Sequence, residues 1–255
     1  MSYGKNGTLG VLTPQANTIV EPEFWSLLPP GWSLINARLT SSLDTIEKRL
    51  VDYTQKFEST PAEFANAPIS AITIACTGTS YLIGHDEETR ITTGIQRRYG
   101  VPCITSAQAS VAALRELDAT RIALLTPYPE SLNKVSVPFW QSHGFDVVAH
   151  CGPAQEDDAF HPIYAMAEQG ACVAYEKLSD SNADAVLMLG TGMATLGALL
   201  HGQERGLLPA VSCNLALVWH AINCCTSNGD DSQCSLQLAD WQSGQHWQQK
   251  YASMV

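Results

Sequence analysis

The chain repeats a pattern of apolar runs that end in short polar turns. Three pairs of segments match in the same order, at separations of 113, 114 and 107 residues. The pairs are residues 10–14 (GVLTP) with 123–127 (ALLTP), residues 76–79 (CTGT) with 190–193 (GTGM), and residues 101–106 (VPCITS) with 208–213 (LPAVSC). Ordered matches at a nearly constant separation indicate that the chain consists of two similar halves.

Each matched segment belongs to a run rich in Val, Ile and Leu that stops at Thr, Ser, Gly or Pro, which is typical of a buried strand in a parallel sheet. Helical spacing occupies stretches between these runs, as in residues 43–57 and 107–117. Alternating strands and helices predict right-handed βαβ units. We therefore expect an α/β fold of two pseudo-symmetric lobes, each a parallel sheet flanked by helices, one formed by residues 1–115 plus 218–255 and the other by 116–217.

The turns after the matched strands indicate where a ligand would bind, because open parallel sheets bind ligands beyond the carboxyl ends of their strands. Both halves should present their turns to one cleft between the lobes. The two halves differ there, since Cys76 in the first half corresponds to Gly190 in the second. Two facing cysteines could move a proton from either side of a substrate, whereas a single thiol acts from one side.

Composition and missing motifs exclude several classes of function. A net charge of −11 with 14 Lys plus Arg argues against binding of nucleic acid. The sequence contains no apolar stretch long enough to span a bilayer, and its start lacks the apolar core of a signal peptide. A Walker lysine, a complete Gly-x-Gly-x-x-Gly and a Gly-x-Ser-x-Gly elbow are absent. We expect a cytoplasmic protein that binds neither membranes nor nucleotides.

The eight cysteines do not form a pattern of metal ligands. His220 and Cys224 have the i, i+4 spacing of one helix face, but no second pair completes a zinc site. With no export signal, we expect free thiols, Cys234 included, and no bound metal.

Cys76 is the strongest catalytic candidate. It follows a buried strand and should lie at a helix N-terminus or in a turn whose N–H groups point outward, a setting that lowers the pKa of a thiol and favours the thiolate. The alternative is a buried structural cysteine at a strand end.

Backbone N–H groups and hydroxyls of the two Gly-Thr turns can hold a carboxylate without any cationic side chain. Asn17 and Tyr128 follow the paired Thr-Pro strand ends, so both can donate a hydrogen bond to a carboxylate or an enolate in the same cleft. Ordinary turn and capping roles are the alternative for each of these groups.

Three segments resemble a known superfamily: residues 10–24 (GVLTPQANTIVEPEF), residues 75–80 with 82–84 (ACTGTS and LIG), and residues 214–221 (NLALVWHA). Together they resemble the aspartate/glutamate racemase superfamily, in particular its maleate isomerase and arylmalonate decarboxylase families. The resemblance extends over nearly the whole chain. It implies two pseudo-symmetric α/β lobes with a cofactor-free site in the cleft between them.

The resemblance also assigns roles to residues. Cys76 matches the nucleophilic cysteine of the isomerases, Asn17 matches a carboxylate contact beside it, and Tyr128, Thr77 and Thr79 resemble the hydroxyls that hold a carboxylate or enediolate. The departure is at Gly190, where isomerases and racemases have their second cysteine and the decarboxylases their only one. The expected substrate-binding residues are Pro14, Asn17, Thr77, Gly78, Thr79, Tyr128, Gly190, Thr191 and Gly192.

The absence of a second cysteine favours some of the candidate reactions over others. It disfavours racemisation, which needs an acid and a base on opposite faces of the substrate. Decarboxylation of a small dicarboxylate or substituted malonate needs an enediolate binding site and one proton donor, which Cys76 can supply. We expect this reaction, with a product configuration opposite to that of the known decarboxylases. The alternatives are isomerisation with Cys76 as the nucleophile, a weaker option of hydrolysis through a thioester, and a non-catalytic protein that binds small carboxylates. A homo-oligomer is left open.

Overall fold

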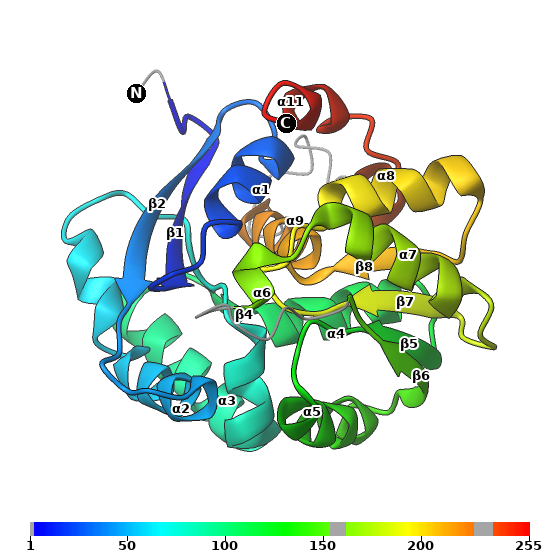
Figure 1. Ribbon diagram of the computed structural model, residues 1–255. Helices are drawn as coiled ribbons and strands as arrows, with labels where there is room; N and C mark the ends of the chain where they lie inside the picture. Colours follow the sequence, from blue (N-terminus) through cyan, green and yellow to red (C-terminus); the bar gives the residue numbers. More distant parts are fainter. Residues whose placement is uncertain (1–2, 154–161, 227–236) are drawn as a thin grey trace.

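The computed structural model describes residues 3–153, 162–226 and 237–255, and places their strands in two parallel sheets (Figure 1). The strands are β1 (Gly7–Pro14), β2 (Trp32–Leu39), β3 (Ala71–Ile74), β4 (Cys103–Thr105), β5 (Arg121–Leu125), β6 (Asp146–Cys151), β7 (Ala185–Met188) and β8 (Ala210–Ser212). Their order is β2-β1-β3-β4 in one sheet and β6-β5-β7-β8 in the other. The second sheet repeats the order of the first with every strand number raised by four. The prediction of an α/β fold with two similar halves is confirmed.

The burial of a strand in its sheet decides whether the strand can be predicted from the sequence. Every residue of β3 and β7, which lie inside the sheets, is buried, so these strands are continuous apolar runs. The edge strand β6 has no buried residue and β2 has only three among its eight, and our sequence analysis did not predict either strand. Their mixed polar and apolar residues follow from having one side of the sheet edge in contact with solvent.

Helices connect consecutive strands and cover the sheets. They are α1 (Val20–Leu27), α2 (Ile46–Lys56), α3 (Thr77–Tyr99), α4 (Ser106–Glu116), α5 (Glu130–Ser142), α6 (Pro162–Ala165), α7 (Glu168–Ser179), α8 (Leu196–Arg205), α9 (Cys213–Thr226), α10 (Leu238–Gln242), α11 (Gln248–Ala252) and the 3₁₀ helix η1 (Thr60–Phe64). The predicted helical stretches 43–57 and 107–117 correspond to α2 and α4. Helix α3 is interrupted at Gly84, whose φ of 75° lies in the left-handed region that favours glycine.

The two halves meet through equivalent helices. α4 follows β4 and α9 follows β8, and these two helices pack against each other in the middle of the molecule (Figure 1). α9 also contacts α1 and β3, which belong to the first half. The division into units 1–115 plus 218–255 and 116–217 stays a prediction.

The cysteines of the described residues are free thiols, and Cys234 lies outside them. Within these residues, no group of three or more His, Cys, Asp or Glu side chains is arranged to hold a metal ion. His220 faces Cys224 one helical turn away on α9, at 3.7 Å between Nε2 and Sγ. None of the described helices combines the length and apolarity needed to cross a bilayer.

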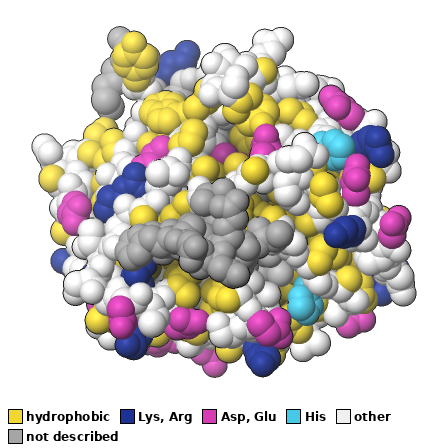
Figure 2. All heavy atoms as spheres, in the orientation of Figure 1, with side chains coloured by type: hydrophobic (Ala, Val, Ile, Leu, Met, Phe, Trp, Pro, Cys, Tyr) yellow, Lys and Arg dark blue, Asp and Glu magenta, His cyan; other side chains and the backbone are white. Residues whose placement is uncertain are grey.

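The surface agrees with the low Lys and Arg content. On the face shown in Figure 2, Lys and Arg side chains are scattered among Asp and Glu and form no continuous basic patch. This face offers no electrostatic footprint for a nucleic acid backbone.

Candidate active site

A pocket lies where the carboxyl ends of β1 and β3 in one sheet face those of β5 and β7 in the other. It encloses about 480 Å³ of space, which includes its open mouth. Its lining residues are Pro14, Asn17, Ile46, Arg49, Leu50, Tyr53, Cys76, Thr77, Gly78, Tyr128, Ile163, Tyr164, Thr191 and Gly192. The site therefore draws on both halves of the fold.

The sequence-derived candidates fall into two groups. Those that line the pocket are Pro14, Asn17, Cys76, Thr77, Gly78, Tyr128, Thr191 and Gly192. Thr79 and Gly190 do not line it. The Thr79 hydroxyl donates to the backbone carbonyl of Cys76 (2.6 Å), so this side chain stabilises the backbone at the cysteine. Gly190 is discussed below.

Cys76 caps the N-terminus of α3, one of the two settings expected of it, but its thiol is not acidic. The residue is only 4% exposed. Burial raises the pKa of the Cys76 thiol to about 12, because removal from water disfavours the thiolate, and hydrogen bonds from Thr79 offset only part of this effect. The prediction of a lowered pKa is therefore wrong. Cys76 rests as a protonated thiol, the form of a proton donor.

Hydroxyl groups surround this thiol. The pKa values of Tyr53, Tyr128 and Tyr164 are all raised, mainly by burial and additionally by the charge that Cys76 would carry, so all three remain donors at neutral pH. Thr77 Oγ1 lies close enough to Tyr128 and to Cys213 to lower the pKa values of both, yet it is buried without a well-formed hydrogen bond to any described residue. A buried hydroxyl without a partner is costly unless a ligand or water completes it. It is thus a candidate contact for a carboxylate oxygen.

Thr191 joins the two halves at the floor of the pocket. Its hydroxyl donates to the carbonyl oxygen of Ala75 (2.8 Å) and accepts from Nδ2 of Asn17 (3.2 Å). Oδ1 of Asn17 in turn accepts from the backbone N–H groups of Ile19 and Val20, at the start of α1. The Asn17 side chain therefore fixes the turn of the second half against the first and still lines the pocket.

An apolar wall occupies the position where a second thiol would project. Gly190 has a φ of 81°, and a Cβ built on it would lie 2.7 Å from Cγ of Pro127 and 3.0 Å from Cδ1 of Ile163. Ile163 itself lines the pocket. The backbone conformation and these two side chains together disfavour a larger residue at position 190.

Gly190→Ala should test this exclusion. We expect it to lower the free energy of unfolding by about 1–3 kcal/mol, because it adds both left-handed strain and overlap with Pro127. Chemical denaturation of the purified variant measures the change. Gly94→Ala is the matched control, since Gly94 is exposed on α3 with open space around it and should be neutral or slightly stabilised. Equal free energies of unfolding for the two variants would contradict the close packing of Pro127 and Ile163 against position 190.

The buried carboxylate of Glu23 is linked through Asn214 to the turn that contains Gly190 and Thr191. Glu23 on α1 accepts hydrogen bonds from the backbone N–H groups of Thr195 and Leu196 at the start of α8, and from Nδ2 of Asn214 (2.7 Å). Asn214 Nδ2 also donates to the backbone carbonyl of Thr191 (3.1 Å). Burial raises the pKa of the Glu23 carboxyl to about 7, and the hydrogen bonds that it accepts oppose this shift.

The raised pKa of Glu23 makes stability depend on pH. The folded protein holds this proton more tightly than the unfolded chain, so its contribution is complete below about pH 4.5 and is lost as pH rises through about 7. We expect the free energy of unfolding of Glu23→Gln, relative to wild type, to rise by about 3 kcal/mol between pH 4.5 and pH 8. Urea unfolding at several pH values measures the difference. Parallel curves for the two proteins would show that Glu23 keeps an ordinary pKa.

Sequence reasoning missed the pocket residues of α2 and α6. Ile46, Arg49, Leu50 and Tyr53 come from α2, and Tyr164 comes with Ile163 from the short α6. The sequence did not place a cationic side chain in the site, whereas Arg49 lines the pocket. The i, i+3, i+4, i+7 spacing on α2 marked a buried helix face, but it did not show which cavity this face would line.

A comparison with known families identifies the chain. The family model described as arylmalonate decarboxylase matches residues 9–237, which include every pocket residue given above. The chain belongs to the arylmalonate decarboxylase family. The resemblance that we inferred from residues 10–24, 75–84 and 214–221 is confirmed, and so is the prediction of an enzyme rather than a binding protein.

The proteins that this chain resembles include a decarboxylase and an isomerase. It is 25% identical to the arylmalonate decarboxylase of Bordetella bronchiseptica over 87% of this chain and 92% of that protein. It is 29% identical to the maleate isomerase of Nocardia farcinica over 54% of this chain and 59% of that protein. Among solved structures, a liganded arylmalonate decarboxylase mutant superposes with a TM-score of 0.73 at 19% identity, covering 88% of this chain and 94% of that one. In that mutant one glycine is replaced by cysteine and one cysteine by serine.

Proposed function

We propose that this family member is a cofactor-independent decarboxylase of a small substituted malonate, in which Cys76 donates the proton that replaces CO₂. The observation that carries the proposal is the protonated thiol of Cys76 in a pocket that Ile163, the neighbour of Gly190, lines with an apolar side chain. One acid on one face is what decarboxylation requires.

The pocket contains the groups for each step. One malonate carboxylate is retained and held by the N–H groups at the start of α3, where the first turn leaves them without helical partners, and by the hydroxyls of Thr77 and Tyr128. The bond to the other carboxylate breaks, CO₂ leaves, and the electron pair becomes the enediolate of the retained group. The same hydrogen bonds stabilise this dianion-like oxygen pair more strongly than the starting carboxylate.

Protonation completes the reaction. The Cys76 S–H proton moves to the α-carbon, which leaves a thiolate and the monocarboxylate product. The N–H groups at the start of α3 and the hydrogen bonds from Thr79 stabilise the transient thiolate. Water from the pocket mouth then returns a proton to sulfur. The net change is replacement of CO₂ by a solvent proton.

The mutant decarboxylase supports the stereochemical part of the proposal. Its two substituted positions are separated by 114 residues, the same separation as between Cys76 and Gly190 in this chain. The change introduces a cysteine at the first position and removes one at the second. This family member carries that arrangement naturally, so its proton should arrive from the face opposite to that used in the unmodified decarboxylases.

Isomerisation of a cis double bond is the second candidate, favoured by the 29% identity to the maleate isomerase. In that reaction Cys76 would add to the double bond as a nucleophile. A thiol with a pKa of about 12 gives little thiolate at neutral pH, which weighs against this route.

Substrate trials separate the two candidates. The purified protein is incubated with phenylmalonate, an alkenylmalonate and maleate, while CO₂ and fumarate are measured. CO₂ release that is lost in Cys76→Ser supports the decarboxylase, and fumarate formation from maleate supports the isomerase. Failure to convert all three compounds would overturn both.

A further inference from the structure

Glu23 and Asn214 do not line the pocket, but they are joined to it through Thr191. Both are almost fully buried, with 6% and 1% of their surfaces exposed. Nδ2 of Asn214 lies between two acceptors, Oε2 of Glu23 (2.7 Å) and the carbonyl oxygen of Thr191 (3.1 Å). Acceptors on both sides fix the amide nitrogen in this position. The contacts therefore connect α1 and the start of α9 to a residue of the pocket.

The turn of residues 190–192, called the Thr191 turn below, is fixed at two polar groups of Thr191. Its hydroxyl donates to the carbonyl of Ala75 and accepts from Asn17, while its carbonyl accepts from Asn214. The backbone N–H groups of Thr191 and Gly192 make no backbone hydrogen bond within the described residues, and both residues line the pocket. Successive N–H groups in a turn are suited to bind an anion such as a carboxylate.

The carboxylate of Glu23 meets donors only, so an amide cannot replace it. Oε1 accepts from the backbone N–H groups of Thr195 and Leu196, and Oε2 accepts from Nδ2 of Asn214. A glutamine would keep its oxygen toward the fixed backbone N–H groups and turn its NH₂ group toward the NH₂ group of Asn214. The amide of Asn214 would then have to rotate, which brings its oxygen against the carbonyl oxygen of Thr191. Position 23 therefore decides whether the Thr191 carbonyl is held.

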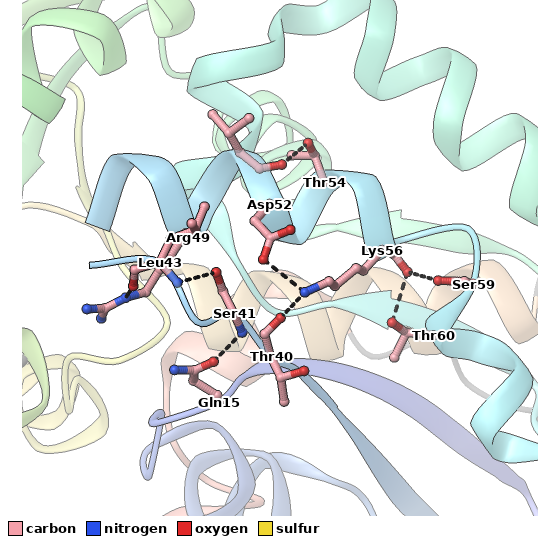
Figure 3. A network of polar contacts seen from close by, with 11 residues as sticks. Gln15, Thr40, Ser41, Leu43, Arg49, Asp52, Thr54, Lys56, Ser59 and Thr60 are labelled. Carbon is pink, nitrogen blue, oxygen red and sulfur yellow. Dashed lines mark hydrogen bonds and ion pairs between the residues drawn. The ribbon is translucent and has the colours of Figure 1, made fainter. Parts of the chain in front are cut away.

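The wall of the pocket that α2 forms is held by other contacts. Figure 3 shows the loop before α2, where Gln15 accepts from the N–H of Ser41 and Nζ of Lys56 donates to the carbonyl of Thr40. These contacts all lie within the first half of the fold. A change in the buried carboxylate or amide should thus displace the Thr191 turn and leave α2 in place.

We infer that Glu23 and Asn214 are positioning residues, which hold the Thr191 turn in the orientation in which its N–H groups bind a carboxylate of the substrate. Neither residue touches the substrate itself. The inference rests on the proposed function, because it takes a malonate as the ligand. It assigns a role in substrate affinity to two side chains that lie outside the pocket.

The affinity for a dicarboxylate tests this role without any turnover. Calorimetry measures binding of phenylmalonate to Cys76→Ser at pH 8, above the pKa of about 7 of the Glu23 carboxyl. In this background we expect Glu23→Gln and Asn214→Leu each to raise the dissociation constant about 10-fold. The two changes together should weaken binding no more than Asn214→Leu alone, because both act through the same contact. The measured stoichiometry reports the folded fraction, so the dissociation constant describes the folded site.

Glu88→Gln is the matched control for a buried carboxylate. Glu88 is 1% exposed, accepts hydrogen bonds from the hydroxyls of Ser80 and Thr105 (2.5 Å each), and does not line the pocket. Each hydroxyl can either donate or accept, so an amide can take the place of this carboxylate. We expect phenylmalonate to bind this variant as tightly as it binds the parent protein.

Either single variant decides the role of its residue, so poor folding of one does not prevent a decision. Unchanged affinity in a folded Glu23→Gln or Asn214→Leu variant would overturn the inference. Equal weakening by Glu88→Gln, or multiplication of the two effects in the combined variant, would do so as well. Absence of CO₂ release by wild type from any malonate would instead refute the proposed function, while the dissociation constants would still decide the role of Glu23 and Asn214.

Discussion

Cys76→Ala should lower kcat for CO₂ release by about 10³-fold, because it removes the acid that protonates the enediolate. Cys76→Ser should lose almost as much, since a hydroxyl is a much weaker acid than a thiol. Steady-state assays with saturating malonate measure both variants. Their free energies of unfolding should stay within about 1–2 kcal/mol of wild type, because the residue is small.

Cys103→Ala is the matched control for this prediction. Cys103 is also buried, and its thiol pKa is likewise raised to about 12, but it lies in β4 and does not line the pocket. We expect unchanged kcat.

The wild-type rate should also not rise tenfold per pH unit between pH 7 and pH 10, because the reactive form is the thiol and its pKa lies above this range. Such a rise would indicate a thiolate nucleophile instead.

Thr77→Val should lower kcat by about 10²-fold, the usual effect of removing one donor to a developing oxyanion. The hydroxyl is buried without a well-formed partner among the described residues, so its loss should cost little stability. The measurement is kcat with KM determined alongside, since a group that acts mainly on the enediolate changes kcat more than KM.

Thr73→Val separates this effect from general disturbance of the first half. Thr73 is fully buried in β3, three residues before the cysteine, and among the described residues its hydroxyl makes one long hydrogen bond, of 3.4 Å, to the carbonyl of Gly10. We expect normal turnover for this variant. Similar losses in Thr73→Val and Thr77→Val would argue against a specific role of the Thr77 hydroxyl.

The fold could be predicted from the sequence where burial leaves a local signature. β3 and β7 are continuous apolar runs inside their sheets, and both end in Gly-Thr turns, so position along the chain was enough to place Cys76 and Thr191 at one cleft. The short helix α6 has no such signature, and Ile163 could not be assigned to the wall near Gly190 from its neighbours in sequence.

The pKa of Cys76 and the location of Arg49 depend on how deeply each side chain is buried, which the sequence does not show. The sequence left open whether Cys76 lies at a helix N-terminus or in a turn, and the structure has it at the start of α3, a position that alone would lower the pKa of its thiol. Burial dominates in the folded protein and reverses the sign. Arg49 was missed for the related reason that a charged residue on an amphipathic helix ordinarily faces solvent, whereas here the fold closes a pocket over it.

The stereochemical course in D₂O tests the single-donor account most directly. A prochiral substituted malonate is converted by wild type, and the product is analysed for deuterium at the α-carbon and for configuration, with the Bordetella bronchiseptica decarboxylase run in parallel. The account predicts one deuterium per product and a single enantiomer, opposite to that of the Bordetella enzyme. A racemic product, or the same enantiomer as that enzyme gives, would contradict proton delivery by Cys76.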